Sequence, residues 1–383
     1  AECAMYCRCG LRKRTYWSLH ALPHKESEQE TEQHIAYLLT DAIKRQLVSD
    51  VPLCTMLSGG LDSSIISAVA AKEFEQNGRQ LTTYSIDYKD NDKNFHSSKF
   101  QPDMDAPWIR KMSAFIGSKH INVEVDTPAL TDALELSTYA RDLPGMADVD
   151  SSLYLFCKAI KGNFTVALSG ECADEIFGGY PWFHRDAMLQ STTFPWTMDI
   201  SFRKSLLHPE FAASMQMEKY IARAYRTTLS EVDILPEESP LDTKKRQIAY
   251  LNIRWFMQTL LDRMDRTSMQ HGLEARVPFA DYRVIDYVFN VPWSIKAKDG
   301  VPKSLLRACA AKYLPDTIMN RPKSPYPKTY HPEYERVLAN RLREVVTDTA
   351  SPLRSYLNIP AVLKFLDEPK EYGKPWFGQL MAG

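Results

Sequence analysis

Apolar residues along the first half of the chain follow two alternating periods. Short apolar or alternating runs predict strands at 51–57, 81–88, 120–125 and 164–169. Helical spacing of apolar residues predicts helices at 27–49, 63–77, 105–116, 131–139 and 151–161. Stretches without either period predict loops at 89–101 and 142–150. Strands that alternate with helices favour a doubly wound parallel sheet, so we expect an α/β fold.

The pattern changes from about residue 180 onward, where helices dominate and strand signals nearly vanish. Helical periods lie at 215–228, 243–267 and 282–289. Residues before the first helix are predicted to form a short β-hairpin around Gly10. The chain is therefore expected to have three parts, namely an opening β-hairpin at 1–20, an α/β domain at 21–185 and a largely helical region at 186–383.

Charge and composition exclude several classes of protein. Lys and Arg number 47 against 48 Asp and Glu, which argues against a general binder of nucleic acid or of membrane surfaces. No apolar run is long enough to span a bilayer, and no signal peptide opens the sequence. The seven cysteines are scattered, which favours free thiols in a reducing cytoplasm. Cys3, Cys7 and Cys9 lack a usual zinc spacing.

One corner of the predicted sheet, between its first strand and the following helix, has the composition of an anion site. Its residues are Ser58, Gly59, Gly60, Leu61, Asp62, Ser63 and Ser64. Two adjacent glycines allow a tight turn and a close approach of the backbone to a ligand. The following helix directs unpaired N–H groups and its positive dipole end into this corner. A phosphate-binding loop accounts for these features, and so does an ordinary Gly-Gly turn capped by Asp62 or Ser63.

A second polar corner follows the strand predicted at 164–169. Glu171, Asp174 and Glu175 place three carboxylates within five residues at a strand-to-helix junction. Because ligands of such sheets bind at the carboxyl ends of the strands, we expect these acids to lie near Asp62. Oxygen ligands beside phosphates are what Mg²⁺ prefers. The alternative explanation is that these acids stabilise the start of a helix, where negative side chains interact favourably with the helix dipole.

Four motifs resemble, in order, signatures of known ATP-using enzymes. Residues 58–63, Ser-Gly-Gly-Leu-Asp-Ser, resemble the pyrophosphate (PP) loop of the ATP pyrophosphatase family. Residues 169–180, Ser-Gly-Glu-Cys-Ala-Asp-Glu-Ile-Phe-Gly-Gly-Tyr, resemble the second signature of glutamine-dependent asparagine synthetases. Residues 262–279 look like a third signature, and 303–307, Lys-Ser-Leu-Leu-Arg, like a fourth. The resemblance implies that 21–185 is a PP-loop, ATP-binding domain with an adenine nucleotide alpha hydrolase-like sheet.

The resemblance also implies a reaction. ATP would adenylate the side-chain carboxylate of aspartate with release of pyrophosphate, and ammonia would then convert the adenylate to asparagine. Lys303 is the expected cation for the transferring phosphate, with Arg263 or Arg266 as further candidates, and Glu171 is expected to orient ammonia or accept its proton. The expected Mg²⁺ ligands are Asp62 and Asp174. The residues expected to hold ATP are Leu57, Ser58, Gly59, Gly60, Asp62, Ser63, Ser64, Ile86, Ser169 and Gly170.

Members of this family normally carry an N-terminal glutaminase domain, so we expect a fragment holding only the synthetase half, with residues 1–20 as the joint. A homodimer is left open. Cys172 stands where the family commonly has glycine or another small residue, and residues 321–330 differ from the better-known bacterial enzymes. The same chemistry on another acid, as in β-lactam synthetases or peptide-modifying cyclases, is therefore the alternative. A tRNA-modifying ATP pyrophosphatase is disfavoured by the neutral charge.

Overall fold

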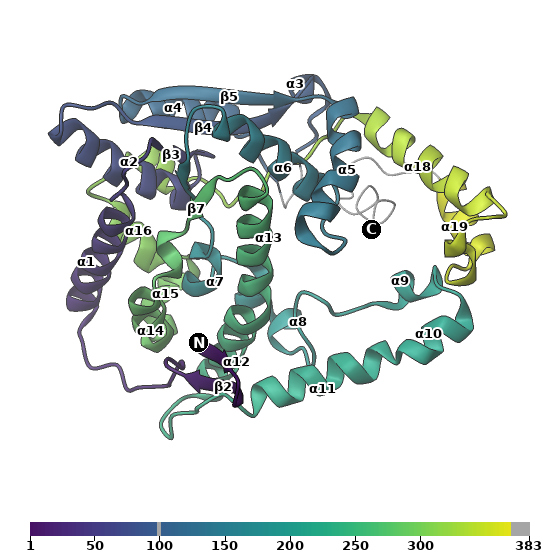
Figure 1. Cartoon of the computed structure of the whole chain (residues 1–383). Helices are drawn as coiled ribbons and strands as arrows, with labels where there is room; N and C mark the ends of the chain where they lie inside the picture. The colour runs from purple at the N-terminus through teal and green to yellow at the C-terminus, as the bar shows by residue number, and fades with distance from the viewer. Residues whose placement is uncertain (98–100, 369–383) are drawn as a thin grey trace.

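The centre of the molecule is a parallel β-sheet, seen in a computed structural model that describes residues 1–97 and 101–368. Within these residues five strands pair in the order β5-β4-β3-β6-β7, and each pairing is parallel. The strands are β3 (Leu53–Met56), β4 (Thr82–Tyr88), β5 (Lys119–Val125), β6 (Val166–Leu168) and β7 (Glu274–Arg276). Figure 1 shows β4 and β5 in the upper part of the view, with β3 below them. The predicted α/β class is confirmed.

Helices connect the strands of the sheet, as their apolar spacing predicts. They are α1 (Glu28–Gln46), α2 (Leu61–Gln76), α3 (Asn91–Asn94), α4 (Ala106–Phe115), α5 (Thr127–Arg141) and α6 (Asp148–Lys161). Helix α1 begins with a capping box, in which the Ser27 side chain accepts from the Glu30 N–H and the Glu30 carboxylate accepts from the Ser27 N–H. The prediction of a loop up to residue 150 was wrong, because Asp148 and Asp150 are acids of the first turn of α6.

The sheet has a hydrophobic cluster on each face, because successive side chains of a strand point to opposite sides. Leu53 and Leu168 belong to a cluster that also contains apolar residues of α1 and α2. Cys54 and Ala167, their neighbours along the chain, belong to a second cluster with residues of α6. Both faces of β3 and β6 are thus covered, which fixes the positions of their carboxyl ends.

Helices dominate the rest of the described chain, as predicted. They are α7 (Ala173–Phe177), α8 (Asp186–Leu189), α9 (Ser201–Ser205), α10 (Pro209–Met215), α11 (Met217–Leu229), α12 (Pro240–Leu251), α13 (Gln258–Met269), α14 (Tyr282–Asn290), α15 (Trp293–Lys296), α16 (Ser304–Ala310), α17 (Asp316–Met319), α18 (Pro332–Thr347) and α19 (Ile359–Asp367). A π-helix (Asn252–Met257) joins α12 to α13, so the long helix predicted at 243–267 is continuous but irregular. Helices α10 and α11 form an arm along the bottom of Figure 1.

Strand β7 was missed by the sequence analysis, which found almost no strand signal after residue 180. It pairs with β6 through bonds such as Ser169 N–H to the Arg276 carbonyl, at 2.8 Å. Its three residues, Glu-Ala-Arg, include two charged ones, which an edge strand tolerates because one of its sides has no partner strand among the described residues. The division at residue 185 stays a prediction, and β7 is a strand of the sheet that comes from beyond it.

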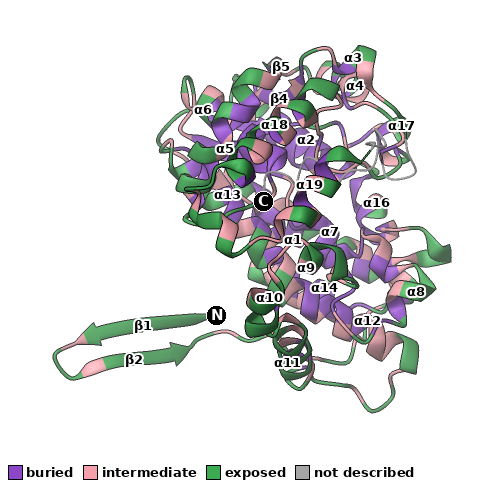
Figure 2. Cartoon of the chain, turned by 90° about the vertical axis from the view of Figure 1, so that its right-hand side faces the viewer, coloured by how far each residue is buried: buried purple, intermediate pink, exposed green. Residues whose placement is uncertain are grey.

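The chain opens with the expected hairpin, formed by β1 (Glu2–Cys7) and β2 (Gly10–Thr15) in antiparallel register. Figure 2 shows it extending away from the body with almost every residue exposed. Within the described residues no three or more His, Cys, Asp or Glu side chains are grouped so that they could hold a metal ion. Over the same residues, no helix combines the length and the apolar character that crossing a membrane requires.

Candidate active site

Two loops meet at the carboxyl edge of the sheet, after β3 and after β6. Strand β3 pairs with β4 on one side and with β6 on the other, so the strand order reverses at this point. Such switch points are where ligands bind in doubly wound sheets. A Cβ atom on Gly170 would lie 2.8 Å from the backbone nitrogen of Ser63, which shows that the two loops are in contact and that glycine is needed here.

The loop after β3 has the compact geometry of an anion cradle. The Ser58 and Ser63 hydroxyls are 2.9 Å apart, and the Ser58 N–H donates to the Ser63 hydroxyl at 3.1 Å. Gly59 has φ +71°, and a Cβ atom there would lie 2.7 Å from the backbone of Trp108 and Ile109. Because α2 begins at Leu61, its first N–H groups point into this loop. The arrangement supports the predicted phosphate site.

Asp62, Asp174 and Lys303 come together from three distant segments of the chain. The Lys303 Nζ atom lies 2.8 and 2.7 Å from the two carboxylate oxygens of Asp62 and 2.5 Å from Asp174 Oδ1. Its side chain is only 5% exposed. A second ammonium group, that of Lys323, forms an ion pair with Asp174 Oδ2. We call these four side chains the charge cluster.

The two lysines keep Asp174 ionised. Burial works against ionisation of this carboxyl, but the nearby charges of Lys303 and Lys323 outweigh it and lower the pKa of Asp174 to about 2. In formal charge the two carboxylates and two ammonium groups cancel. A divalent cation that joined this cluster would bring excess positive charge, which phosphates could balance.

The backbone around the charge cluster leaves it little freedom. A Cβ atom on Gly179 would lie 1.9 Å from Asp174 Oδ1 and 2.3 Å from Lys303 Cε. Lys303 itself has φ +57°, a left-handed conformation that is rare for a lysine. Cys172, just before α7, has φ +73° and is 1% exposed. That left-handed φ explains why glycine suits the position, while the small buried thiol packs into the core.

Glu171 and Arg263 form a buried pair beside the charge cluster. The Arg263 guanidinium donates to Glu171 Oε1 at 2.8 Å. The other oxygen of Glu171 is buried and has no hydrogen-bond partner among the described residues. Burial raises the pKa of Glu171, although the charge of Arg263 opposes this. A carboxyl with a raised pKa and a free oxygen is suited to binding or exchanging a proton.

Arg266, the further catalytic cation predicted from the sequence, has two acidic partners on the surface. It is 42% exposed and pairs with Asp142 at 2.6 Å and with Asp262 at 2.7 Å, and its catalytic role stays a prediction. It lies three residues after Arg263 on α13, and its guanidinium is held by these two acids.

The ATP-binding role of the residues predicted to hold the nucleotide stays a prediction. Leu57 and Ile86 are buried in different hydrophobic clusters. Ser169 is buried at the end of β6, where its hydroxyl accepts from the Glu171 N–H at 3.4 Å. Ser64 is fully buried in α2 and its hydroxyl has no hydrogen-bond partner among the described residues.

Two basic residues of the site were missed, Arg321 and Lys323. Arg321 donates to the Ser58 carbonyl at 2.8 Å and forms a buried ion pair with Asp105. Both lie in a segment without helical or strand period, which the sequence analysis singled out only because it differs from the better-known bacterial enzymes.

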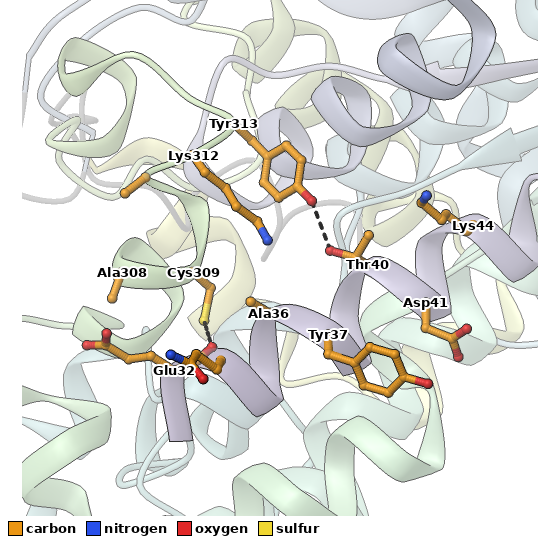
Figure 3. A pocket seen from close by; sticks show the side chains of 12 residues that line it. Glu32, Ala36, Tyr37, Thr40, Asp41, Lys44, Ala308, Cys309, Lys312 and Tyr313 are labelled. Atoms are coloured by element: carbon orange, nitrogen blue, oxygen red, sulfur yellow. Dashed lines mark hydrogen bonds between the residues drawn. The ribbon is translucent and has the colours of Figure 1, made fainter. Parts of the chain in front are cut away.

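A surface groove of about 640 Å³ lies between α1 and α16, and its lining is separate from the charge cluster and from the loop after β3 (Figure 3). Its lining includes Glu32, Thr40, Cys309 and Tyr313, and none of the residues of the charge cluster. Hydrogen bonds cross it from the Cys309 thiol to the Glu32 carbonyl, at 3.4 Å, and between the Thr40 and Tyr313 hydroxyls, at 3.3 Å. The groove has neither a phosphate loop nor paired carboxylates, so it is not the candidate active site.

Comparison with known proteins identifies relatives of this chain. A sequence model of the family described as asparagine synthase matches residues 34–382. Asparagine synthetase [glutamine-hydrolyzing] 3 of Bacillus subtilis is 46% identical over the whole chain, and the match covers 62% of that protein. Asparagine synthetase [glutamine-hydrolyzing] 1 of the same organism is 26% identical over 93% of the chain and 58% of its own length. The human asparagine synthetase [glutamine-hydrolyzing] is 27% identical over 78% of the chain, and the match covers 43% of that protein.

Proposed function

The chain belongs to the asparagine synthase family, and on that premise we propose that it uses ATP to adenylate the side-chain carboxylate of aspartate and then transfers ammonia to form asparagine. The products besides asparagine would be AMP and pyrophosphate. The observation that carries the proposal is the contact of Lys303 with both Asp62 and Asp174, at the edge of the sheet where the phosphate loop lies.

The loop from Ser58 to Ser63 would hold the β- and γ-phosphates through its backbone N–H groups and the N-terminus of α2. Asp62 and Asp174 both lie within 3 Å of one nitrogen atom, so their oxygens converge on a volume that one cation fills. Two carboxylates together with phosphates suit Mg²⁺, which would be held by these acids and would neutralise charge on the phosphates. Lys303 would lie against the transferring phosphate and stabilise the negative charge that develops there.

Glu171 would act in the second step. Its unpartnered oxygen is available to accept a hydrogen bond from ammonia and to take a proton as the new bond to carbon forms. Arg263 keeps its other oxygen in place, at 2.8 Å. Several relatives are called glutamine-hydrolyzing and are longer than this chain. We therefore include in the proposal a glutaminase domain as the physiological source of ammonia.

Two measurements on the purified chain test this function. With ATP, Mg²⁺, aspartate and ammonium chloride it should form asparagine, AMP and pyrophosphate in equal amounts, and ADP with phosphate would contradict the proposal. Aspartate alone should stimulate exchange of labelled pyrophosphate into ATP, because that exchange reports adenylation without ammonia. Exchange stimulated by another acid, and not by aspartate, would move the activity to a different amide-forming ligase.

Two substitutions separate the half-reactions. Lys303→Ala should abolish pyrophosphate exchange, because the main cation at the transferring phosphate is lost. Glu171→Gln should spare exchange and reduce amide formation. The matched control is Lys298→Ala. Like Lys303, Lys298 lies shortly before α16, but it is exposed and pairs with Glu28 at 2.6 Å. Equal loss of both steps in Glu171→Gln would remove that residue from ammonia transfer.

A further inference from the structure

Two rows of side chains face each other beside Glu171, one on α6 and one at residues 326–328. The Ser152 and Tyr326 hydroxyls are 3.4 Å apart, so these two residues form one end of the contact. Asp148 lies one helical turn before Ser152 on the same face of α6. Its charge acts on Lys328, two residues after Tyr326. The rows therefore run side by side, with Asp148 and Lys328 at their far end.

The near end of these rows adjoins the Glu171–Arg263 pair. The Arg263 guanidinium, which donates to Glu171 at 2.8 Å, lies 6.0 Å from the centre of the Tyr326 ring. Burial raises the pKa of Tyr326, and the charges of Arg263 and Glu171 also act on its hydroxyl. An acyl carbon that receives ammonia beside Glu171 would lie at the Tyr326 end, and the rest of the acid would extend toward Lys328.

The ammonium group of Lys328 has no hydrogen-bonded carboxylate among the described residues. Burial lowers the pKa of Lys328, and the negative charges of Asp148 and Glu335 oppose this, but neither acid forms a hydrogen bond with it. Its Nζ atom lies 4.7 Å from the centre of the Tyr330 ring, which holds the ammonium group in place. The Tyr330 hydroxyl donates in turn to Gln101 at 2.7 Å. A partly buried cation in a fixed position is suited to binding a carboxylate.

The spacing of the two ends matches the length of a short dicarboxylic acid. Residues four apart on a helix have Cβ atoms about 5–6 Å apart, so Lys328 lies roughly that far from the Tyr326 end of the rows. The two carboxyl carbons of aspartate are joined by three bonds of about 1.5 Å each, and their oxygens extend this reach. With the reacting carboxyl beside Glu171, the second carboxylate would meet Lys328.

We infer that Lys328 determines acceptor specificity by binding the carboxylate of the acid that does not react. The inference rests on the proposed function, since it assigns a residue to the acid of the same reaction. An acid of equal length with one carboxylate would lose this ion pair and leave the ammonium group without its anion. Lys328 would therefore favour aspartate over such acids and have no effect on the affinity for ATP.

Pyrophosphate exchange tests the inference with two acids that differ by one carboxylate. β-Alanine is aspartate without its α-carboxylate, so its KM in the unaltered protein should be about 10-fold higher or more. Lys328→Met keeps the aliphatic stem and removes the charge. It should raise the KM for aspartate about 10-fold or more and leave the KM values for ATP and β-alanine unchanged. Lys328→Arg should restore most of the affinity for aspartate. If β-alanine supports no exchange, its inhibition constant against aspartate replaces its KM.

The matched control is Lys312→Met, which should keep the KM for aspartate. It removes an exposed lysine in the groove between α1 and α16, whose Nζ atom lies 5.0 Å from the centre of the Tyr313 ring. Thermal unfolding shows whether Lys328→Met is folded, and Lys328→Gln is a second uncharged variant if it is not. In a folded variant, an unchanged KM for aspartate, or an equal rise for aspartate and β-alanine, would overturn the inference.

Absence of exchange with aspartate in the unaltered protein would reject the proposed function instead. Titration calorimetry with aspartate and β-alanine, in the presence of ATP and Mg²⁺, would then decide the role of Lys328. Aspartate binding that is lost in Lys328→Met supports the role, and aspartate binding that is absent or equal in the two proteins rejects it.

Discussion

Gly179 is the residue at which a single added carbon should do most harm to the site. Gly179→Ala would place Cβ 1.9 Å from Asp174 Oδ1 and 2.3 Å from Lys303 Cε, so the charge cluster must shift. We expect pyrophosphate exchange to fall about 100-fold, because misplacement of reacting groups by about 1 Å has effects of that size. Thermal unfolding should change little. Gly162→Ala is the control, because its Cβ would meet nothing closer than 3.3 Å; equal activity of the two variants would contradict this expectation.

Lys296 is a buried lysine whose charge opposes folding. It is 2% exposed, its ammonium donates to the Val288 carbonyl at 3.1 Å, and it lies 4.4 Å from the centre of the Trp293 ring. Burial lowers the pKa of Lys296 from 10.5 to about 7. The unfolded chain therefore holds one more proton than the folded chain between these two pH values. The stability cost is fully present below pH 7 and is lost as the pH rises toward 10.5.

Lys296→Met should remove this dependence on pH. The free energy of unfolding of the unaltered protein should gain about 1.4 kcal/mol per pH unit relative to the variant as the pH rises from 7 to 9. Urea unfolding of both proteins at three pH values measures the difference directly. A difference that stays constant over this range would show that Lys296 keeps its ordinary pKa in the folded state.

The residues of the site differ in how far the sequence could predict them. Asp62, Asp174 and Lys303 each lie in one of the four motifs found in the sequence, and the structure brings them together. Arg266 shares its motif with Arg263, but its guanidinium pairs with Asp142 and Asp262, whereas that of Arg263 pairs with Glu171. Lys323 lies in none of the four motifs. Its position beside Asp174 depends on tertiary contacts, such as that of Arg321 with the Ser58 carbonyl, which the sequence does not show.

At the level of elements, β7 links the sheet to α1 through one side chain. Arg276 donates from Nη1 to the Gln46 carbonyl at 2.6 Å and to the Val48 carbonyl at 2.7 Å, which are acceptors at and after the end of α1. Arg276→Ala should lower the free energy of unfolding by about 2 kcal/mol, measured by urea unfolding. Arg45→Ala removes an exposed arginine of α1 paired with Asp41 and should cost about 0.5 kcal/mol or less. Equal effects of the two would exclude the linking role.

Element prediction succeeded where a period extends over many residues and failed where it does not. The strand at 81–88 and the helix at 27–49 correspond to β4 and α1 within a few residues. Strand β7 has three residues, so no period can show, and its pairing with β6 depends on tertiary contacts alone. Helix α6 begins earlier than predicted because Asp148 and Asp150, typical of loops, are equally typical of a first helical turn.

At the scale of the whole molecule, the site exists only in the folded chain. Its parts are the loops after β3 and β6, the start of α16 and the segment from Arg321 to Lys328. Figure 1 shows that these elements come from both the early and the late parts of the sequence. A ligand that contacts all of them should therefore stabilise distant segments at the same time, because binding to the folded state alone shifts the unfolding equilibrium of every segment it requires.

Hydrogen exchange with and without ATP and Mg²⁺ tests this coupling. We expect slower exchange in peptides covering 58–63 and 321–328 together, because phosphates bound to the loop would stabilise its contact with Arg321. Peptides of α1 that line the groove of Figure 3 should be unchanged and serve as an internal control. The slower exchange at 58–63 and at 321–328 should vanish in the Asp62→Asn and Asp174→Asn variants. Protection in α1 without protection at 58–63 would place the nucleotide in the groove, and the charge cluster would then need another explanation.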